Sequence, residues 1–145
     1  MSLNSPQAIE NHIRQTVGLA RDMDFRVTQA RAGFAEIEVG FQAHMTRLGG
    51  TISGPVIMTA VDSAMYAAVM ATSEHGRYGV TSHLSIDFLR RPAATGLIVR
   101  SRILRLGRKS ANFAVEVFSQ SDPDRLVAHA SGAYALFESA APEAG

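Results

Sequence analysis

Hydrophobic and polar positions along the chain separate one long apolar segment from several short alternating ones. Residues 56–71 read VIMTAVDSAMYAAVMA, and Asp62 is the single charged residue among them. The segment is apolar on nearly every side of a helix, so we expect a helix that the rest of the molecule surrounds. It is too short to cross a bilayer, which requires about 20 residues, and it carries an acid. We therefore expect no membrane contact.

Alternation of apolar and polar residues with a period of two predicts strands on both sides of this helix. In residues 80–89 the alternation puts Leu84 on the apolar face and Thr81 on the opposite, polar face. A weakly helical segment, 5–17, comes first, and we expect a frayed tail over 138–145. The predicted strands are 25–30, 33–41, 80–89, 97–106, 111–119 and 126–137.

Short turns join most of the later strands, which is typical of an antiparallel sheet. The order of elements predicts one α+β domain over residues 1–145, with a curved, mostly antiparallel sheet wrapped around one long central apolar helix. The glycine-containing segment 44–55 is expected to be a loop that leads into that helix.

Composition narrows the class of protein. The chain has no cysteine, and its five histidines are scattered without metal-ligand spacing, so we expect no metal site. The N-terminal residues lack a basic segment followed by an apolar one, and we expect a cytoplasmic protein. Residues 90–109 hold seven of the fourteen basic residues and no acid. This block either binds phosphate groups or forms the solvated face of two strands. Few aromatic residues accompany it, so we expect no nucleic acid partner.

Asp62 raises the question on which the function depends. An ionised carboxylate is costly to bury without partners. Either Thr59, Ser63 or Tyr66 satisfies it by hydrogen bonding, or it is present for chemistry. Proline favours the first position of a helix, which predicts Pro55 there and Gly54 as the cap.

The helix start is the second candidate for chemistry. Backbone N–H groups at a helix N-terminus can stabilise a developing oxyanion. Asp62 lies eight residues beyond Gly54, about 12 Å along the axis. That distance is too long for both to act on one small substrate atom within one chain. It suits two chains, of which one supplies the helix start and the other the acid.

The segment Arg47-Leu48-Gly49-Gly50-Thr51-Ile52-Ser53-Gly54-Pro55, followed by six residues and then Asp62, resembles the PaaI-like group of hotdog-fold thioesterases. The Arg105-Leu106-Gly107-Arg108 hairpin is also similar to theirs, and the resemblance covers about 24–137. It implies a hotdog fold and hydrolysis of an acyl-CoA thioester to free acid and CoA. It also implies a homodimer with shared sites, or a dimer of dimers, and no cofactor, because CoA is part of the substrate.

The resemblance implies a role for several residues of the site. Asp62 matches the catalytic acid, as nucleophile or as the base that activates water, and Gly54 matches the oxyanion donor. Thr81 matches a position where a hydroxyl helps to place water, and Arg47 stands where the family usually has Asn or Gln. Ser53 and Pro55, where the family has His and a second Gly, are expected on the substrate side of this turn.

Further residues are candidates for holding the substrate. Arginine and lysine suit the phosphates of CoA, and Arg91, Arg108 and Lys109 lie near predicted turns. Met58 and Met65 are candidates for lining the acyl pocket, because methionine adapts to irregular apolar shapes.

Two other functions compete with hydrolysis. One is a hotdog enoyl-CoA hydratase or dehydratase, which acts on the same thioesters with His plus an acid. The turn before the long helix and the helix itself contain no His, which disfavours it. The other is an acyl-CoA-binding hotdog protein without catalysis.

Overall fold

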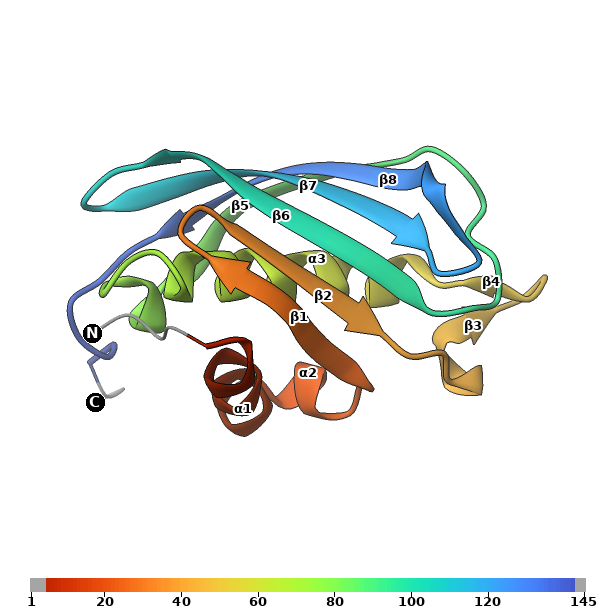
Figure 1. The fold of residues 1–145 in the computed structure, drawn as a ribbon, viewed down its shortest axis with the longest axis horizontal. Helices are drawn as coiled ribbons and strands as arrows, with labels where there is room; N and C mark the ends of the chain where they lie inside the picture. The colour runs from red at the N-terminus through yellow and green to blue at the C-terminus, as the bar shows by residue number, and fades with distance from the viewer. Residues whose placement is uncertain (1–4, 143–145) are drawn as a thin grey trace.

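The computed structural model describes residues 5–142 and arranges them as an antiparallel sheet curved around one long helix (Figure 1). The helices are α1 (Pro6–Thr16), α2 (Gly18–Arg21) and α3 (Gly54–Met70), with short 3-10 turns η1 (Ala43–Met45) and η2 (Gly76–Tyr78). The strands are β1 (Phe25–Arg31), β2 (Phe34–Val39), β3 (Thr46–Arg47), β4 (Thr51–Ile52), β5 (Val80–Phe88), β6 (Leu97–Leu106), β7 (Ser110–Ser119) and β8 (Asp122–Ala135).

The strand order of the sheet is β1-β2-β6-β7-β8-β5, and every neighbouring pair is antiparallel. This arrangement confirms the predicted α+β hotdog architecture. The two edges of the sheet are β1 and β5, so β5 has one side without a strand partner within residues 5–142. The short strands β3 and β4 pair with each other in a separate hairpin just before α3.

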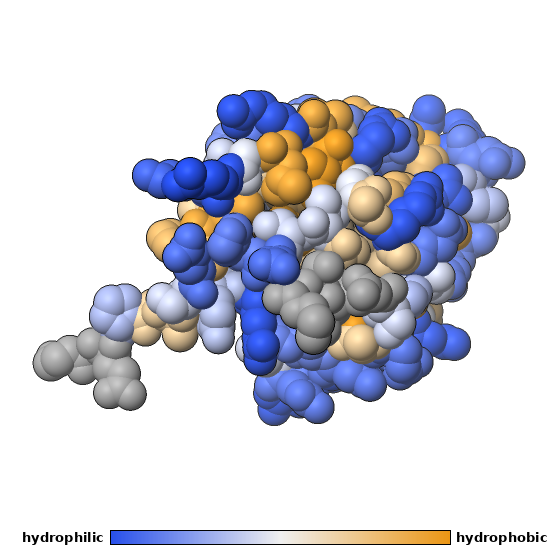
Figure 2. Space-filling view, turned by 60° about the vertical axis from the view of Figure 1, so that its left-hand side comes forward, coloured by the Kyte–Doolittle hydropathy of each residue, from blue (hydrophilic) through white to orange (hydrophobic). Residues whose placement is uncertain are grey.

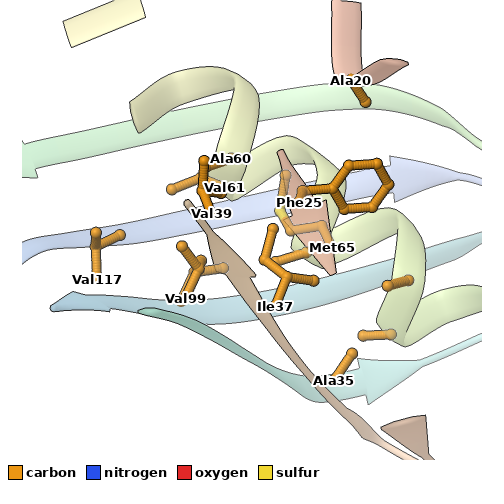
Figure 3. Packing of buried hydrophobic residues seen from close by; sticks show 14 of the residues in the cluster. Ala20, Phe25, Ala35, Ile37, Val39, Ala60, Val61, Met65, Val99 and Val117 are labelled. Atoms are coloured by element: carbon orange, nitrogen blue, oxygen red, sulfur yellow. The ribbon is translucent and has the colours of Figure 1, made fainter. Parts of the chain in front are cut away.

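The long helix α3 is buried on most sides, as its sequence predicts. Val61 and Met65 pack among Ile37, Val39 and Val99, which come from β2 and β6 (Figure 3). Burial of these side chains removes apolar surface from water, at roughly 25 cal/mol per Å². Within the described part of the chain, no helix is both long and apolar enough to span a membrane.

The N-terminal helix α1 packs beside β1 and α3. Its start is capped by Ser5, whose hydroxyl accepts a hydrogen bond from the Ala8 N–H at 3.1 Å. Ile9 and Ile13, one turn apart on α1, are fully buried in the hydrophobic core. The chain then turns through α2, which the sequence pattern did not predict, before entering β1.

The largest differences from the expected element boundaries are in the segment before α3 and in the last strand. The segment 44–55, expected as a loop, contains the β3–β4 hairpin. The last strand begins at Asp122 and ends at Ala135, instead of covering 126–137. Of the predicted tail, 138–142 contains no helix or strand, and 143–145 lies outside the described residues.

Candidate active site

The β3–β4 hairpin fixes the start of α3. Gly49 and Gly50 at its tip have φ angles of 94° and 76°, a conformation that favours glycine. After the hairpin, the Ser53 N–H donates to the Met45 carbonyl at 2.9 Å, which holds the chain as it enters the helix. The position of the first helical turn therefore follows from a tight, glycine-dependent loop.

The helix begins one residue earlier than predicted. Ser53 is the N-cap and Gly54 the first helical residue, so Pro55 occupies the second position. The Ser53 side chain makes no capping hydrogen bond. The N–H groups of Gly54 and Val56 thus lie at the positive end of the helix dipole without a side-chain cap, which leaves them suited to a ligand oxygen.

The carboxylate of Asp62 is held by two hydroxyl groups from the sheet. Its Oδ1 accepts hydrogen bonds from Thr81 Oγ1 at 2.5 Å and from the Tyr134 hydroxyl at 2.9 Å. Within residues 5–142 no hydrogen bond or ion pair reaches Oδ2. Of the local partners considered from sequence, Thr59 and Tyr66 bond other atoms, the carbonyls of Pro55 and Arg77. The acid is therefore fixed through one oxygen while the other stays free.

Tyr134 is a rigid donor to this carboxylate. Burial, and then the negative charge of Asp62, raise the pKa of Tyr134 well above its ordinary value, so the hydroxyl stays protonated. Its ring stacks against Tyr66, with 6.2 Å between the ring centres, and meets the Phe113 ring edge-on at 5.6 Å. These contacts hold the hydroxyl in place beneath Asp62.

A β-bulge explains how Thr81 reaches Asp62. Thr81 pairs with Tyr134 of β8, but the next paired residue is His83, opposite Ala133, so Ser82 is the extra residue. Strict alternation had put Thr81 and Leu84 on opposite faces of the strand. The bulge breaks that alternation, and both side chains line the hollow beside Asp62.

This hollow has a volume of about 270 Å³. Asp62 and the hydroxyl groups of Thr59, Ser63 and Thr81 form its polar part. Its apolar part comes from several separate segments of the chain: Val17, Leu19, Met58 and Leu84. A carboxylate beside an apolar hollow is suited to bond cleavage next to an apolar group.

Comparison with known proteins identifies the family. The model of the thioesterase superfamily matches residues 49–126, which is more than half of the chain. The chain belongs to the thioesterase superfamily. This family carries out thioester hydrolysis, so the protein is a hydrolase.

Individual relatives agree with this placement. A candidate esterase of Saccharolobus solfataricus is 27% identical over 128 residues, which cover 88% of this chain and 89% of that protein. A structure of a candidate thioesterase from Silicibacter has a TM-score of 0.81 at 25% identity, covering 94% of each chain. The E. coli PaaI protein from the phenylacetic acid degradation operon shares the fold, with a TM-score of 0.76 at 18% identity, covering 92% of this chain and 96% of its own.

The two halves expected of a thioesterase site lie apart within one chain. Gly54 is at the start of α3 and Asp62 is more than two turns further along it. Phe88, at the far end of β5, packs over Gly54, where an added Cβ would lie 3.7 Å from its ring. Thr81, at the near end of β5, touches Asp62. Strand β5 thus connects both halves.

The predicted residues around the turn have different surroundings. Arg47 is exposed on the β3–β4 hairpin, and within the described residues it forms no ion pair with Asp62. Met58 lines the hollow beside Asp62 and is 47% exposed. Met65 is fully buried in the core and is not part of the hollow's lining. The two methionines lie seven residues apart, on nearly the same face of α3. They differ in what covers that face, because Met65 packs close to Gly132 of β8 whereas Met58 borders the hollow.

The predicted basic residues fall at opposite ends of the sheet (Figure 1). Arg91 follows β5 and lies near the start of α3, because the adjacent Pro92 carbonyl accepts from Thr51. Arg108 and Lys109 form the β6–β7 turn and line a hollow of about 500 Å³. Figure 2 shows the end of the molecule from which the C-terminal tail projects, where hydrophilic side chains surround an exposed hydrophobic patch.

Tyr134 is the site residue that sequence reasoning missed. It lies 72 positions from Asp62 in the chain, and only the pairing of β5 with β8 brings them together. The pairing of Thr81 with Tyr134 across β5 and β8 is the signal that identifies Tyr134 as a residue of the site. Within residues 5–142 no three histidine, aspartate or glutamate side chains gather closely enough to hold a metal ion.

Proposed function

We propose that this protein hydrolyses an acyl-CoA to free acid and CoA, with Asp62 as nucleophile or general base. The observation that carries the proposal is the Asp62 carboxylate. Two hydroxyl groups hold its Oδ1, its Oδ2 is unbonded within the described residues, and it lines an apolar hollow. This combination fits attack next to an apolar acyl group.

Two copies of the chain are needed to complete the site. We infer that β5 pairs with β5 of a second copy, because it is a sheet edge with exposed Val80 and Phe88, followed directly by exposed Leu89. Thr81 and Phe88 lie seven residues apart, about 23 Å along the strand. An antiparallel two-fold pairing centred between them sets Thr81 of one chain opposite Phe88 of the other.

That pairing brings the halves of the site together. Thr81 touches Asp62 and Phe88 covers Gly54, so Asp62 of one chain approaches the helix start of its partner. Two equivalent sites form per dimer, and a dimer of dimers would hold four. Within a single chain no such approach exists, since the helix separates the two groups.

The same pairing places basic residues of both chains beside one site. Lys109 lies at the Thr81 end of β5, because the Leu136 N–H donates to the Lys109 carbonyl beside the pairing of Val80 with Ala135. Arg91 lies at the Phe88 end. In the dimer, Arg91 of one chain and Arg108 and Lys109 of the other flank one site. We propose that they attract the phosphates of CoA.

The reaction follows from these positions. The thioester carbonyl oxygen accepts a hydrogen bond from the Gly54 N–H, which stabilises the negative charge that develops there. Asp62 Oδ2 either attacks the carbonyl carbon or removes a proton from an attacking water. The C–S bond breaks and CoA leaves as a thiolate. The thiolate takes up the proton that Asp62 removed from the attacking water or, where Asp62 itself attacks, a proton from solvent water. Where Asp62 attacks, water then hydrolyses the anhydride and restores the carboxylate. The chemistry uses no cofactor.

Replacing the acid tests the proposal. Asp62→Asn keeps the shape and an acceptor for Thr81 and Tyr134 but removes the base, so thiol release should fall about 10²- to 10⁴-fold. The measurement is thiol release across short, long, branched and aryl acyl-CoAs. Asp124→Asn, an exposed acid of β8 that lies outside the β5 edge, is the matched control and should retain full activity.

Three outcomes would contradict the proposal. The first is full turnover by Asp62→Asn. The second is hydration of crotonyl-CoA without release of CoA by the unmodified protein, which would assign the site to a hydratase. The third is saturable binding of acyl-CoA with no thiol release, which would indicate a binding protein.

A further inference from the structure

The hollow beside Asp62 has one wall that comes from outside the region matched by the family model. Val17 and Leu19 belong to the α1–α2 segment, whereas the family match begins at residue 49. Met58 of α3 and Leu84 of β5 form the rest of the apolar lining. The N-terminal segment therefore contributes to the lining of the site.

Two of the apolar side chains that line the hollow are exposed to solvent. Leu19 is 74% exposed and Met58 is 47% exposed. Single exposed leucines are ordinary on protein surfaces. Here, however, four apolar side chains from three segments surround one hollow that contains a carboxylate, which is the composition of a ligand site.

The α1–α2 segment is anchored firmly enough to act as a wall. Ala20, next to Leu19, is 1% exposed and packs into the core. The Val27 N–H of β1 donates to Glu10 Oε1 at 2.9 Å, which ties α1 to the sheet. Arg21 Nε donates to the Arg14 carbonyl at 3.1 Å, which ties α2 back to α1. Leu19 is thus held beside the hollow by its neighbours.

We propose that Leu19 determines which acyl groups this protein accepts, an inference that rests on the proposed hydrolysis of acyl-CoA. Among the described residues, no lysine, arginine or histidine lines the hollow, so none of them offsets a second negative charge near Asp62. The preferred substrates carry an apolar alkyl or aryl acyl group that packs against Leu19. Acyl groups that end in a carboxylate are rejected, because Asp62 repels them.

Two substitutions at this exposed position test the assignment. Each methylene buried against the wall is worth roughly fourfold in kcat/KM. Leu19→Ala should therefore lower kcat/KM for octanoyl-CoA about tenfold and change that for acetyl-CoA less than twofold. Leu19→Phe narrows the hollow and should shift the preference toward shorter acyl groups. Leu104→Ala, a 63% exposed leucine on β6, is the matched control and should leave every substrate unchanged.

The outcomes separate this inference from the proposed function. Equal loss for every chain length in Leu19→Ala, or no change for any, would overturn the role of Leu19. Absence of thiol release by the unmodified protein would overturn hydrolysis instead. In that case, affinities for non-hydrolysable thioether analogues decide the role of Leu19. A preference for octanoyl over acetyl analogues that disappears in Leu19→Ala supports it, and an unchanged preference overturns it.

Discussion

At the scale of single residues, the Tyr134 hydroxyl, which holds Asp62 together with Thr81, is the main addition to what the sequence predicted. Asp62 and Gly54 could be recognised from their positions in and before one apolar helix. Tyr134 could not, because its contact with Asp62 depends on the pairing of β5 with β8. The burial of Met65 could not be predicted for a related reason: Met58 and Met65 lie on nearly the same face of α3, and only the packing of β8 against that face covers Met65.

The role of Tyr134 as a positioning residue predicts a specific loss. Tyr134→Phe removes one of the two donors to Oδ1, and a hydrogen bond to a charged group is worth about 1.5–3 kcal/mol. We expect kcat/KM to fall about 10- to 10²-fold, while thermal unfolding shows that the fold is retained. Tyr78→Phe, an exposed tyrosine whose ring contacts Arg77, serves as control. A Tyr134→Phe enzyme with unchanged kcat/KM would show that Thr81 alone positions the acid.

At the scale of elements, the number and order of strands followed from alternation, but their irregularities did not. The bulge at Ser82 reverses the facing of Thr81, and the β3–β4 hairpin stands where a plain loop was expected. Both depend on pairing between strands, which a local pattern does not contain. These irregularities are what position the site, since one turns Thr81 toward Asp62 and the other fixes the helix start.

The close packing of α3 on the sheet depends on Gly132 of β8. A Cβ added there would lie 2.4 Å from the Met65 sulfur and 3.2 Å from the His83 carbonyl oxygen. Gly132→Ala should therefore lower the free energy of unfolding by about 1–3 kcal/mol, measured by urea denaturation. Gly18→Ala, where an added Cβ meets nothing within 4 Å, should change it by less than about 0.5 kcal/mol. Equal stability of the two variants would mean that Met65 has room to move.

At the scale of the whole molecule, the sequence predicted a shared site from one distance, and the sheet topology supplies a way to build it. The unpaired edge β5 carries the contact to Asp62 at one end and the cover over Gly54 at the other.

Removing the Gly54 N–H tests the part of the site that the helix start supplies. Gly54→Pro fits a first helical position after the extended Ser53 and deletes only that donor, whereas Gly54→Ala adds a Cβ but keeps it. Loss of an oxyanion donor lowers kcat about 10²- to 10³-fold.

Mixed dimers of Asp62→Asn with Gly54→Pro decide whether the site is shared. In such a dimer, the first chain retains its Gly54 N–H and the second retains its Asp62. If Asp62 works with the partner's helix start, one of the two sites contains both groups intact. Heterodimers purified through two different tags should then show about half of the unmodified activity, although each parent variant is nearly inactive. If both groups belong to one chain, every site in the heterodimer lacks one of them, and its activity stays as low as that of the parents.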